Sequence, residues 1–236
     1  MVTDVNLLVL SNGHLQVTGR LVDASNATLY ATSTHEDQSV VCIYKPIAGE
    51  RPLWDFSDGC LAHREYAAYL VSHHLGFNLV PLTILRDGPY GFGMVQQWID
   101  IDEDIDLATF FSSDHPRLRS MALFDAIINN TDRKIGHLLP VDTQSLFGCD
   151  HGVTFHAEDK LRTVLWQWAN EAFTAEEITL LHNVLLELSG KLGELLAPLL
   201  TETEIQETRR RVSELLHTGK FPLPNPNWPA VPWPAF

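Results

Sequence analysis

Two acidic residues in separate loops are the side chains of this sequence best placed to do chemistry. Asp132 lies in Asn-Asn-Thr-Asp-Arg-Lys-Ile-Gly-His (129–137), directly after an apolar segment, and Asp150 lies in Gly-Cys-Asp-His-Gly (148–152). One acid could accept a proton from an attacking hydroxyl while the other holds a metal on a nucleotide's phosphates. This division of labour is typical of phosphoryl transfer, in which the protein mainly positions groups and neutralises charge.

The loop around Asp132 is suited to general acid–base work. A proton-accepting carboxylate must be held within about 3 Å of the hydroxyl, and a tight loop after a packed helix supplies that rigidity. Lys134, two residues on, could meet the charge of the transferred phosphate. The structural alternative is a loop in which Asn129, Asn130, Asp132 and Arg133 only cap the helix and pair with one another.

Asp150 is the better candidate for holding magnesium, which prefers a few protein oxygens together with phosphate oxygens. His137, five residues after Asp132, could be a second metal ligand or a hydrogen-bond donor to phosphate. Histidine is an uncommon magnesium ligand, so both roles stay open. For His151 and His156 the sequence favours a structural role.

Lys45 ends an otherwise apolar strand-like run, Val-Val-Cys-Ile-Tyr-Lys. A lysine at the end of a buried strand needs an anion, and Glu65 in the following helix is its natural partner. The alternative is a lysine that extends its charge into solvent at the strand end, with Glu65 exposed.

The elements that must position these residues begin with strands. Apolar or alternating runs bounded by turn residues predict five strands, over residues 15–22, 27–34, 39–45, 79–85 and 91–99. Residues 23–26 form the first turn. A helix is predicted over residues 61–75, with Gly76 as its C-terminal cap.

The second half of the sequence is helical. Residues 102–106 form an acidic connector that begins a short helix toward Phe111, and a buried helix starts at Pro116 and contains a single polar residue, Asp125, between residues 121 and 128. Residues 137–141 and 145–149 predict a hairpin. Capping boxes at Thr174 and Thr201 predict helices that run toward Leu192 and Gly219.

The sequence therefore predicts an α+β protein with a strand-rich N-terminal lobe over residues 1–99 and a helical C-terminal lobe over residues 100–221. A cleft between two lobes is a common place for a small-molecule site. The tail, residues 222–236, carries six prolines and cannot be a regular helix. We expect it to be extended and either to pack Trp228 and Trp233 on the body or to bind a protein partner.

Composition narrows the classes of partner. The net charge of −14 disfavours nucleic acid and anionic lipid surfaces as partners. No apolar run reaches the roughly 18 residues that a membrane-spanning helix needs, so no stable membrane insertion is expected. The N-terminus lacks the basic start of a signal peptide, and the three cysteines are widely spaced, which is typical of reduced thiols in a cytoplasmic protein.

These residues together resemble a known family. Cys-Ile-Tyr-Lys45-Pro, His-Arg-Glu65-Tyr, the loop from Asn129 to His137 and Cys-Asp150-His-Gly look like the phosphatidylinositol 3-/4-kinase-like branch of the protein-kinase-like fold. More closely, the chain resembles actinobacterial proteins described as related to those lipid kinases. It shares the Asn-x-Asp-Arg pattern with type II phosphatidylinositol 4-kinases and HipA-like kinases. The resemblance covers residues 15–156.

The resemblance implies a two-lobed protein-kinase-like fold and an ATP- and magnesium-dependent kinase whose phosphate acceptor is open. By it, Asp132 is the catalytic acid/base residue and Asp150 the metal ligand. The residues implied to bind the nucleotide are Lys45 and Glu65 at the phosphates, Gln97, Trp98 and Ile99 as the connector at adenine, and Ser25 in the turn over the phosphates.

Three alternatives remain. Where the family usually has Asn, this chain has His137, and the turn over residues 23–26 lacks a Gly-rich sequence, which favours a nucleotide-binding pseudokinase that acts as a regulatory or scaffold module. A metal hydrolase would use Asp132, His137, Asp150, His151 and His156, although their spacing matches no familiar zinc pattern. A nucleophilic Cys149 beside His151 is the weakest interpretation.

Overall fold

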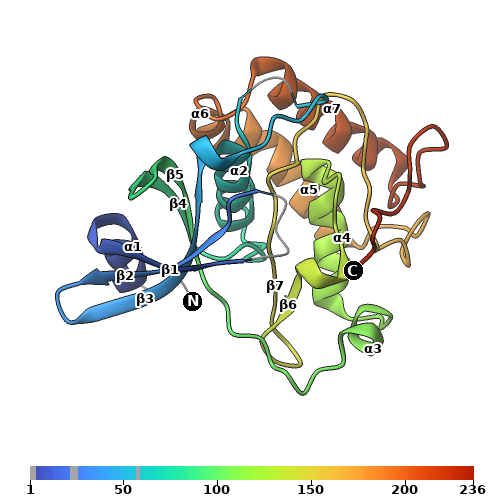
Figure 1. Cartoon of the computed structure of the whole chain (residues 1–236). Coiled ribbons are helices and arrows are strands. Elements are labelled where there is room, and N and C mark those ends of the chain that lie inside the picture. The colour runs from blue at the N-terminus through green and yellow to red at the C-terminus, as the bar shows by residue number, and fades with distance from the viewer. Residues whose placement is uncertain (1–3, 22–25, 57–58) are drawn as a thin grey trace.

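An antiparallel sheet forms the N-terminal part of the protein in the computed structural model, which describes residues 4–21, 26–56 and 59–236. Its strands lie in the spatial order β1-β2-β3-β5-β4, and every neighbouring pair is antiparallel. Their bounds are β1 (His14–Arg20), β2 (Leu29–His35), β3 (Gln38–Pro46), β4 (Thr83–Gly88) and β5 (Gly91–Gln97). The sheet lies on the left of Figure 1.

Two helices accompany this sheet. Helix α2 (Leu61–His74) carries a buried face of small and apolar residues that also includes Glu65. Helix α1 (Asp4–Asn12) was not predicted from the sequence; Ser33 Oγ donates to Val9 O at 2.7 Å and Arg86 donates to Leu10 O, so side chains of two strands hold it. Because its outward residues are apolar too, its sequence gives little of the periodicity that marks a surface helix.

Helices dominate the rest of the chain, along the top and on the right of Figure 1. A short 3₁₀ turn, η2, and a two-stranded hairpin separate the first two of these helices from the last three. The bounds are α3 (Leu107–Phe111), α4 (Pro116–Ile128), η2 (Ile135–His137), β6 (Leu138–Pro140), β7 (Leu146–Gly148), α5 (Ala175–Leu188), α6 (Lys191–Leu196) and α7 (Glu202–Thr218).

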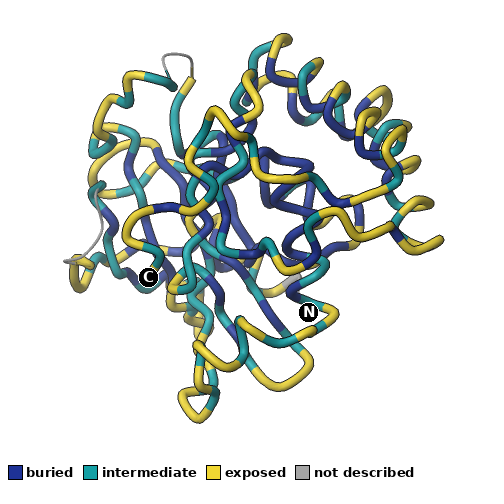
Figure 2. Tube along the Cα trace, turned by 90° about the vertical axis from the view of Figure 1, so that its right-hand side faces the viewer, coloured by how far each residue is buried: buried dark blue, intermediate teal, exposed yellow. Residues whose placement is uncertain are grey.

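Helix α4 forms the centre of this part. From Met121 to Ile128 every residue is buried, including Asp125, and Phe124 packs against Phe77 with ring centroids 5.3 Å apart. Asn129 ends the helix in the left-handed conformation, which asparagine tolerates well. Figure 2 shows the buried positions gathered in the interior of the trace and the exposed ones on its outer turns and loops.

Local signals predicted most of these elements. Pro116 starts α4, Thr174 and Thr201 cap α5 and α7 through capping boxes, and Gly219 ends α7 with a positive φ. The predicted hairpin is present as β6 and β7. No helix among the described residues is long and apolar enough to span a bilayer.

Three predictions need correction. Residues 79–82 lie outside the strand that begins at Thr83, and the helix that starts after Thr174 ends at Leu188, after which a turn through Gly190 leads into α6. In the tail, Trp228 is half-buried, but the Trp233 side chain is 92% exposed and does not pack on the body. Residues 22–25, which include most of the predicted phosphate-covering turn, lie outside the described residues.

Candidate active site

Lys45 joins three separate elements through one ammonium group. It lies near the end of β3, and its Nζ donates to Glu65 Oε1 on α2 at 2.5 Å and to Asp150 Oδ1 at 2.9 Å. The other oxygen of Glu65, Oε2, accepts the backbone N–H of His151 at 2.9 Å. The predicted pair of Lys45 and Glu65 is therefore formed, and Asp150 is brought to it from 105 residues further along the chain.

The opposite charges of this cluster stabilise one another's ionised forms. Burial disfavours the Lys45 ammonium, but the carboxylates of Asp150 and Glu65 outweigh burial and raise the pKa of Lys45. Lys45 in turn lowers the pKa of Asp150, so that carboxyl stays ionised. Burial raises the pKa of Glu65 against the opposing effect of Lys45. The cluster thus carries one cation between two carboxyl groups, of which Asp150 is 51% exposed and free to meet a ligand.

The backbone around Asp150 explains how this acid reaches the site. Asp150 has a φ of 59°, in the left-handed region that Asp and Asn tolerate better than most residues. Two residues on, a Cβ added at Gly152 would lie 3.2 Å from Leu61 Cβ. A side chain at this position would push the loop away from α2, so glycine lets the loop run close to the helix that carries Glu65.

His137 lies on the far side of Asp150 from Lys45, with 3.5 Å between its Nε2 and Asp150 Oδ2. Burial lowers the pKa of His137, so its imidazole is neutral near pH 7. The backbone N–H of Lys134 points at Nδ1 from 3.5 Å, which places the proton on Nε2. In this tautomer Nε2 is a hydrogen-bond donor and has no lone pair for a metal.

Asp132 is held by two cations. Arg162 donates to its Oδ1 at 3.1 Å, and Lys134 Nζ lies 3.4 Å from its Oδ2. Its backbone N–H donates to Asn130 Oδ1 at 3.0 Å, in a tight turn after α4. The Asp132 side chain is 24% exposed, so its carboxylate is accessible from solvent.

Beneath these loops lies a buried charge network that the site rests on. Arg133 is fully buried, and its Nε donates to Asp125 Oδ2 at 2.9 Å while a terminal nitrogen donates to Oδ1 at 2.9 Å. It also donates to Cys149 O at 3.1 Å and to His151 Nε2 at 2.7 Å. One guanidinium therefore ties α4, the Asp132 loop and the Asp150 loop together.

The other histidines and the cysteine are structural. A guanidinium can only donate, so His151 Nε2 is an acceptor and Nδ1 carries the proton; burial keeps the pKa of His151 well below its usual value. Both nitrogens of His156 are engaged, with Glu158 N at 3.0 Å and Asp55 O at 2.7 Å. Burial raises the pKa of the Cys149 thiol to about 12, which leaves no reactive thiolate.

The predicted adenine connector begins at Gln97, the last residue of β5, and continues beyond the strand. The backbone N–H of Gln97 donates to Leu82 O and that of Trp98 to Val41 O, so two amides of the connector bond within the sheet region. The Trp98 ring packs edge-on against Tyr30 with centroids 5.2 Å apart. Ile99 is half-buried. Ser25 lies outside the described residues.

The donor groups suit a magnesium ion that arrives with nucleotide phosphates. Among the described residues, no three His, Cys, Asp or Glu side chains come together in a way that would hold a metal. Asp150 offers one exposed carboxylate, and magnesium is often bound by one or two carboxylates with phosphate oxygens and water completing its shell. The tautomer of His137 makes it a donor to phosphate more readily than a ligand.

Two residues that hold the site loops in place were not predicted as site residues from the sequence. Arg162 lies in a loop without regular structure 30 residues after Asp132, and nothing in the sequence marks it. Asp125 is the one polar residue between Met121 and Ile128 in the sequence, which is a signal for a buried partner. That partner, Arg133, lies eight residues further on, in the loop after the helix ends.

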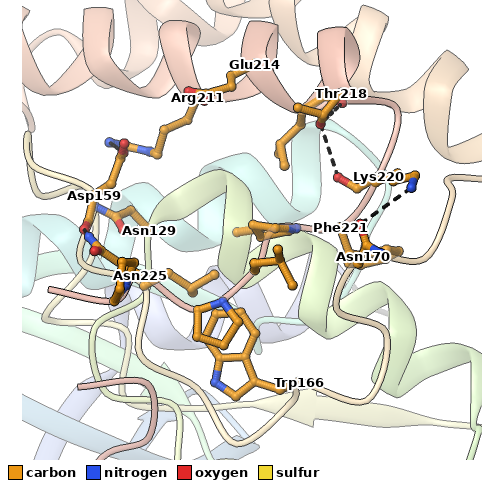
Figure 3. Close-up of a pocket in the computed structure, with 17 residues that line it drawn as sticks. Asn129, Asp159, Trp166, Asn170, Arg211, Glu214, Thr218, Lys220, Phe221 and Asn225 are labelled. Atoms are coloured by element: carbon orange, nitrogen blue, oxygen red, sulfur yellow. Dashed lines mark hydrogen bonds and ion pairs between the residues drawn. The ribbon is translucent and has the colours of Figure 1, made fainter. Parts of the chain in front are cut away.

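A cavity of about 480 Å³ lies elsewhere, between α4, α7 and the start of the tail. Figure 3 shows Arg211 reaching from α7 toward Asp159 at one end and Lys220 beside Asn170 at the other. Its walls include none of the predicted site residues. The cavity has its own cations and acids, among them Arg211 and Asp159, which lie 3.7 Å apart. We place the candidate site at Lys45 and Asp150 because residues of three separate sequence motifs meet there.

Comparison with known proteins shows the fold and the family. No protein-family model matches the sequence. Two solved structures are similar: the Golgi casein kinase, with a TM-score of 0.54 and 14% identity over 91% of this chain and 73% of that chain, and the Helicobacter pylori proinflammatory kinase CtkA, with a TM-score of 0.51 and 10% identity over 90% and 94%.

The predicted protein-kinase-like fold, with an N-terminal antiparallel sheet and a helical C-terminal region, is therefore confirmed. Identities this low show the fold alone. In sequence, Protein Rv2133c of Mycobacterium tuberculosis is 43% identical over 263 aligned positions, which cover 97% of this chain and 94% of that protein. Because this identity extends over nearly the whole of both proteins, the chain belongs to the family of Protein Rv2133c.

Proposed function

We propose that this protein is an ATP- and magnesium-dependent phosphotransferase of the phosphatidylinositol 3-/4-kinase-like class. The observation that carries the proposal is the position of the Lys45 ammonium between Glu65 at 2.5 Å and Asp150 at 2.9 Å. A strand lysine anchored by a helix carboxylate and set against a second, exposed carboxylate is an arrangement suited to a metal-bound polyphosphate.

Each residue proposed to bind the nucleotide has one role. Lys45 contacts the phosphates, and Glu65 keeps its ammonium in place. Gln97, Trp98 and Ile99 form the connector beside adenine. Ser25, which lies outside the described residues, keeps the phosphate-covering role that the family resemblance gives it.

Asp150 would hold the magnesium ion, and that ion would neutralise charge on the phosphates. His137, neutral and protonated on Nε2, donates a hydrogen bond to a phosphate oxygen beside it. The 2.9 Å between Lys45 Nζ and Asp150 Oδ1 supports a role for both groups at the same phosphates.

Asp132 acts on the acceptor. Its carboxylate takes the proton from the acceptor hydroxyl as that oxygen bonds to the γ-phosphorus and the bond to the bridging oxygen of ADP breaks. Arg162 and Lys134 hold the two carboxylate oxygens, which fixes the direction of proton transfer. Lys134 also lies within reach of the transferred charge, while Asp132 later returns the proton to solvent.

The acceptor is a small polar metabolite or a protein hydroxyl in preference to a phosphoinositide. A net charge of −14 makes the approach to an anionic membrane unfavourable unless a basic patch offsets it. In the only basic run, Arg209 to Arg211, Arg210 pairs with acids on its own helix and with Asp159, and Arg211 also lies near Asp159. Arg209 donates a hydrogen bond to Ser189 Oγ.

The test begins with nucleotide binding. Purified protein is heated with ATP, ADP, GTP or no nucleotide, with and without magnesium; a hundredfold excess of ATP over its dissociation constant raises the free energy of unfolding by about 2.7 kcal/mol. Release of labelled phosphate from ATP is then compared between the intact protein, Asp132→Ala and the surface control Glu194→Gln. Stabilisation by no nucleotide would contradict the proposal.

A second function is favoured by one observation. His137 stands where the resembled family usually carries a metal-binding Asn, and its Nε2 proton makes it a poor ligand. A nucleotide-binding pseudokinase that acts as a regulatory or scaffold module has this property. Nucleotide-dependent stabilisation without turnover, equal in the intact protein and Asp132→Ala, would support this module and contradict the kinase.

A further inference from the structure

The last seven residues of the chain lie against the loop that carries Asp132. We infer that this segment, residues 230–236 and here named the strap, positions the catalytic loop for the reaction. The inference rests on the proposed function for its catalytic meaning. The strap is held by backbone hydrogen bonds at its two ends, to Thr163 and to Ile135, and by a hydrogen bond from the Trp166 indole.

The first contact is at Ala230. Its carbonyl oxygen accepts the backbone N–H of Thr163 at 3.0 Å and the indole N–H of Trp166 at 2.9 Å. Thr163 is buried, so its amide has a strong need for a partner. The carbonyl of Ala230 satisfies that amide and fixes the path of the chain around Thr163.

The second contact is at Ala235. Its carbonyl oxygen accepts the backbone N–H of Ile135 at 2.9 Å, one residue after Lys134. A Cβ added at Gly136 would lie 3.9 Å from the backbone carbonyl carbon of Phe236, so the strap follows the loop beyond this bond. The terminus labelled C in Figure 1 accordingly lies beside the turn that precedes β6.

The strap reaches Asp132 through the segment around Thr163. Arg133 N donates to Arg162 O and Val164 N donates to Arg133 O, each at 3.1 Å, which pairs this segment with the catalytic loop in parallel. The Thr163 N–H points to the other side, toward Ala230. The catalytic loop, residues 162–164 and the strap are therefore three neighbouring chain segments, joined in that order by backbone hydrogen bonds.

Arg162 completes the connection. Its Nε donates to Thr131 O at 2.7 Å, and a terminal nitrogen donates to Asp132 Oδ1 at 3.1 Å. A shift of residues 162–164 would move the guanidinium and release the carboxylate it orients. Misplacement of a catalytic group by about 1 Å can lower a rate by about a hundredfold, so a small loosening matters for catalysis.

The strap does this mainly with its backbone. Val231, Trp233 and Phe236 are exposed, and Trp233 contributes almost no buried surface. A change of Trp233 therefore leaves both carbonyl contacts intact and serves as a matched control. Shortening the chain after Pro234 removes the Ile135 contact, and shortening it after Pro229 removes both contacts but keeps Trp228.

Hydrogen exchange tests the strap without reference to activity. The amides of Arg133 and Val164 bond to each other's segments and not to the strap. If the strap holds the three segments together, these two amides exchange about tenfold faster after removal of residues 230–236, as expected for the loss of roughly one hydrogen bond. Trp233→Ala leaves them unchanged. Unchanged exchange in both shortened proteins overturns the inference.

Measuring kcat together with the dissociation constant of ATP distinguishes a positioning role of the strap from a general effect on the stability of the fold. Removal of residues 230–236 lowers kcat for ATP turnover by about tenfold, and removal of residues 235–236 has a smaller effect. Lys45 on β3 and Asp150 in another loop contact ATP in the proposed function, so the dissociation constant of ATP stays within about twofold. A parallel loss of ATP affinity and kcat overturns the positioning role, because it indicates a general disturbance of the fold.

The two proposals fail in different ways. An intact protein that neither binds nor turns over ATP contradicts the proposed function, while the exchange of Arg133 and Val164 still decides whether the strap holds the loop. An active intact protein whose kcat is unchanged by either shortening contradicts the strap alone. Should the protein shortened after Pro229 fail to fold, the protein shortened after Pro234 decides through the Ile135 contact.

Discussion

The loops of Asp132 and Asp150 each place two neighbouring residues in opposite environments. Asp132 and Asp150 are accessible and paired with lysine, arginine or histidine at the surface of the site. Their neighbours Arg133 and His151 are fully buried and bonded to each other at 2.7 Å. In both loops one residue is available to a ligand while the next anchors the loop in the core.

In each loop, the buried residue fixes the position of the accessible one. A loop lacks the regular backbone ladder of a helix or strand, so its position depends on side-chain contacts together with isolated backbone hydrogen bonds such as that of Arg133 N with Arg162 O. Arg133 provides this by binding Asp125 on α4 and the carbonyl of Cys149, next to Asp150. The accessible pair and the buried pair should therefore respond differently to substitution, in activity and in stability respectively.

The largest effect is expected in the buried pair. Asp125→Ala leaves the Arg133 guanidinium buried without its carboxylate, which costs about 3–5 kcal/mol of unfolding free energy. Replacing both, as Asp125→Leu with Arg133→Met, removes the unpaired charge and restores much of that loss. Urea unfolding measures both. A cost below about 1 kcal/mol for the single change would show that water reaches the network.

The next effect concerns the accessible acid. Asp132→Asn keeps the shape of the side chain but removes the proton acceptor, so turnover falls by about 10²–10⁴-fold. Its ion pairs are partly exposed, and stability therefore changes by less than about 1 kcal/mol. Phosphate release and urea unfolding are measured on the same preparation, with Glu194→Gln as the control. Retained turnover would assign the proton transfer to another group.

A smaller effect is expected at Asp150, where Asn is the best matched replacement because it tolerates the same left-handed backbone. Asp150→Asn weakens magnesium binding, so the stabilisation of about 2.7 kcal/mol by saturating ATP loses its dependence on magnesium. Thermal unfolding with ATP and a magnesium series measures this. Asp142→Asn, in the exposed hairpin turn, should leave the magnesium dependence intact; equal behaviour of the two variants would remove Asp150 from the metal site.

The smallest effect is a pH dependence of stability. Burial lowers the pKa of both His151 and His137 below the unfolded value of about 6.5, so below that pH the unfolded chain binds more protons than the folded one. The free energy of unfolding therefore falls as the pH drops from 7 toward 5. His151→Gln removes one of these protons and lowers the slope by up to roughly 1.4 kcal/mol per pH unit. Urea unfolding at pH 5.5 and 7.5 compares the slopes, and equal slopes would mean that His151 is protonated in the folded protein.

The sequence by itself determined the local structure and the residue types of the candidate site. The helix caps are short-range signals: the side chains of Thr174 and Thr201 bond an amide three residues away, and Gly219 ends its helix through a left-handed backbone. The lone Lys45 after an apolar strand and the acid within the buried helix were visible for the same reason. Residue type and local period suffice for such features.

Only the tertiary structure decided which charges meet. The contact of Lys45 with Asp150, the pairing of Asp132 with Arg162 and the return of Ala230 and Ala235 to the catalytic loop join residues far apart in the chain. Nothing in a local pattern fixes such pairs, since each depends on how the packed elements bring distant loops together. A partner is selected by the free energy of the whole fold, in which a buried amide or charge must be satisfied by whatever group lies next to it.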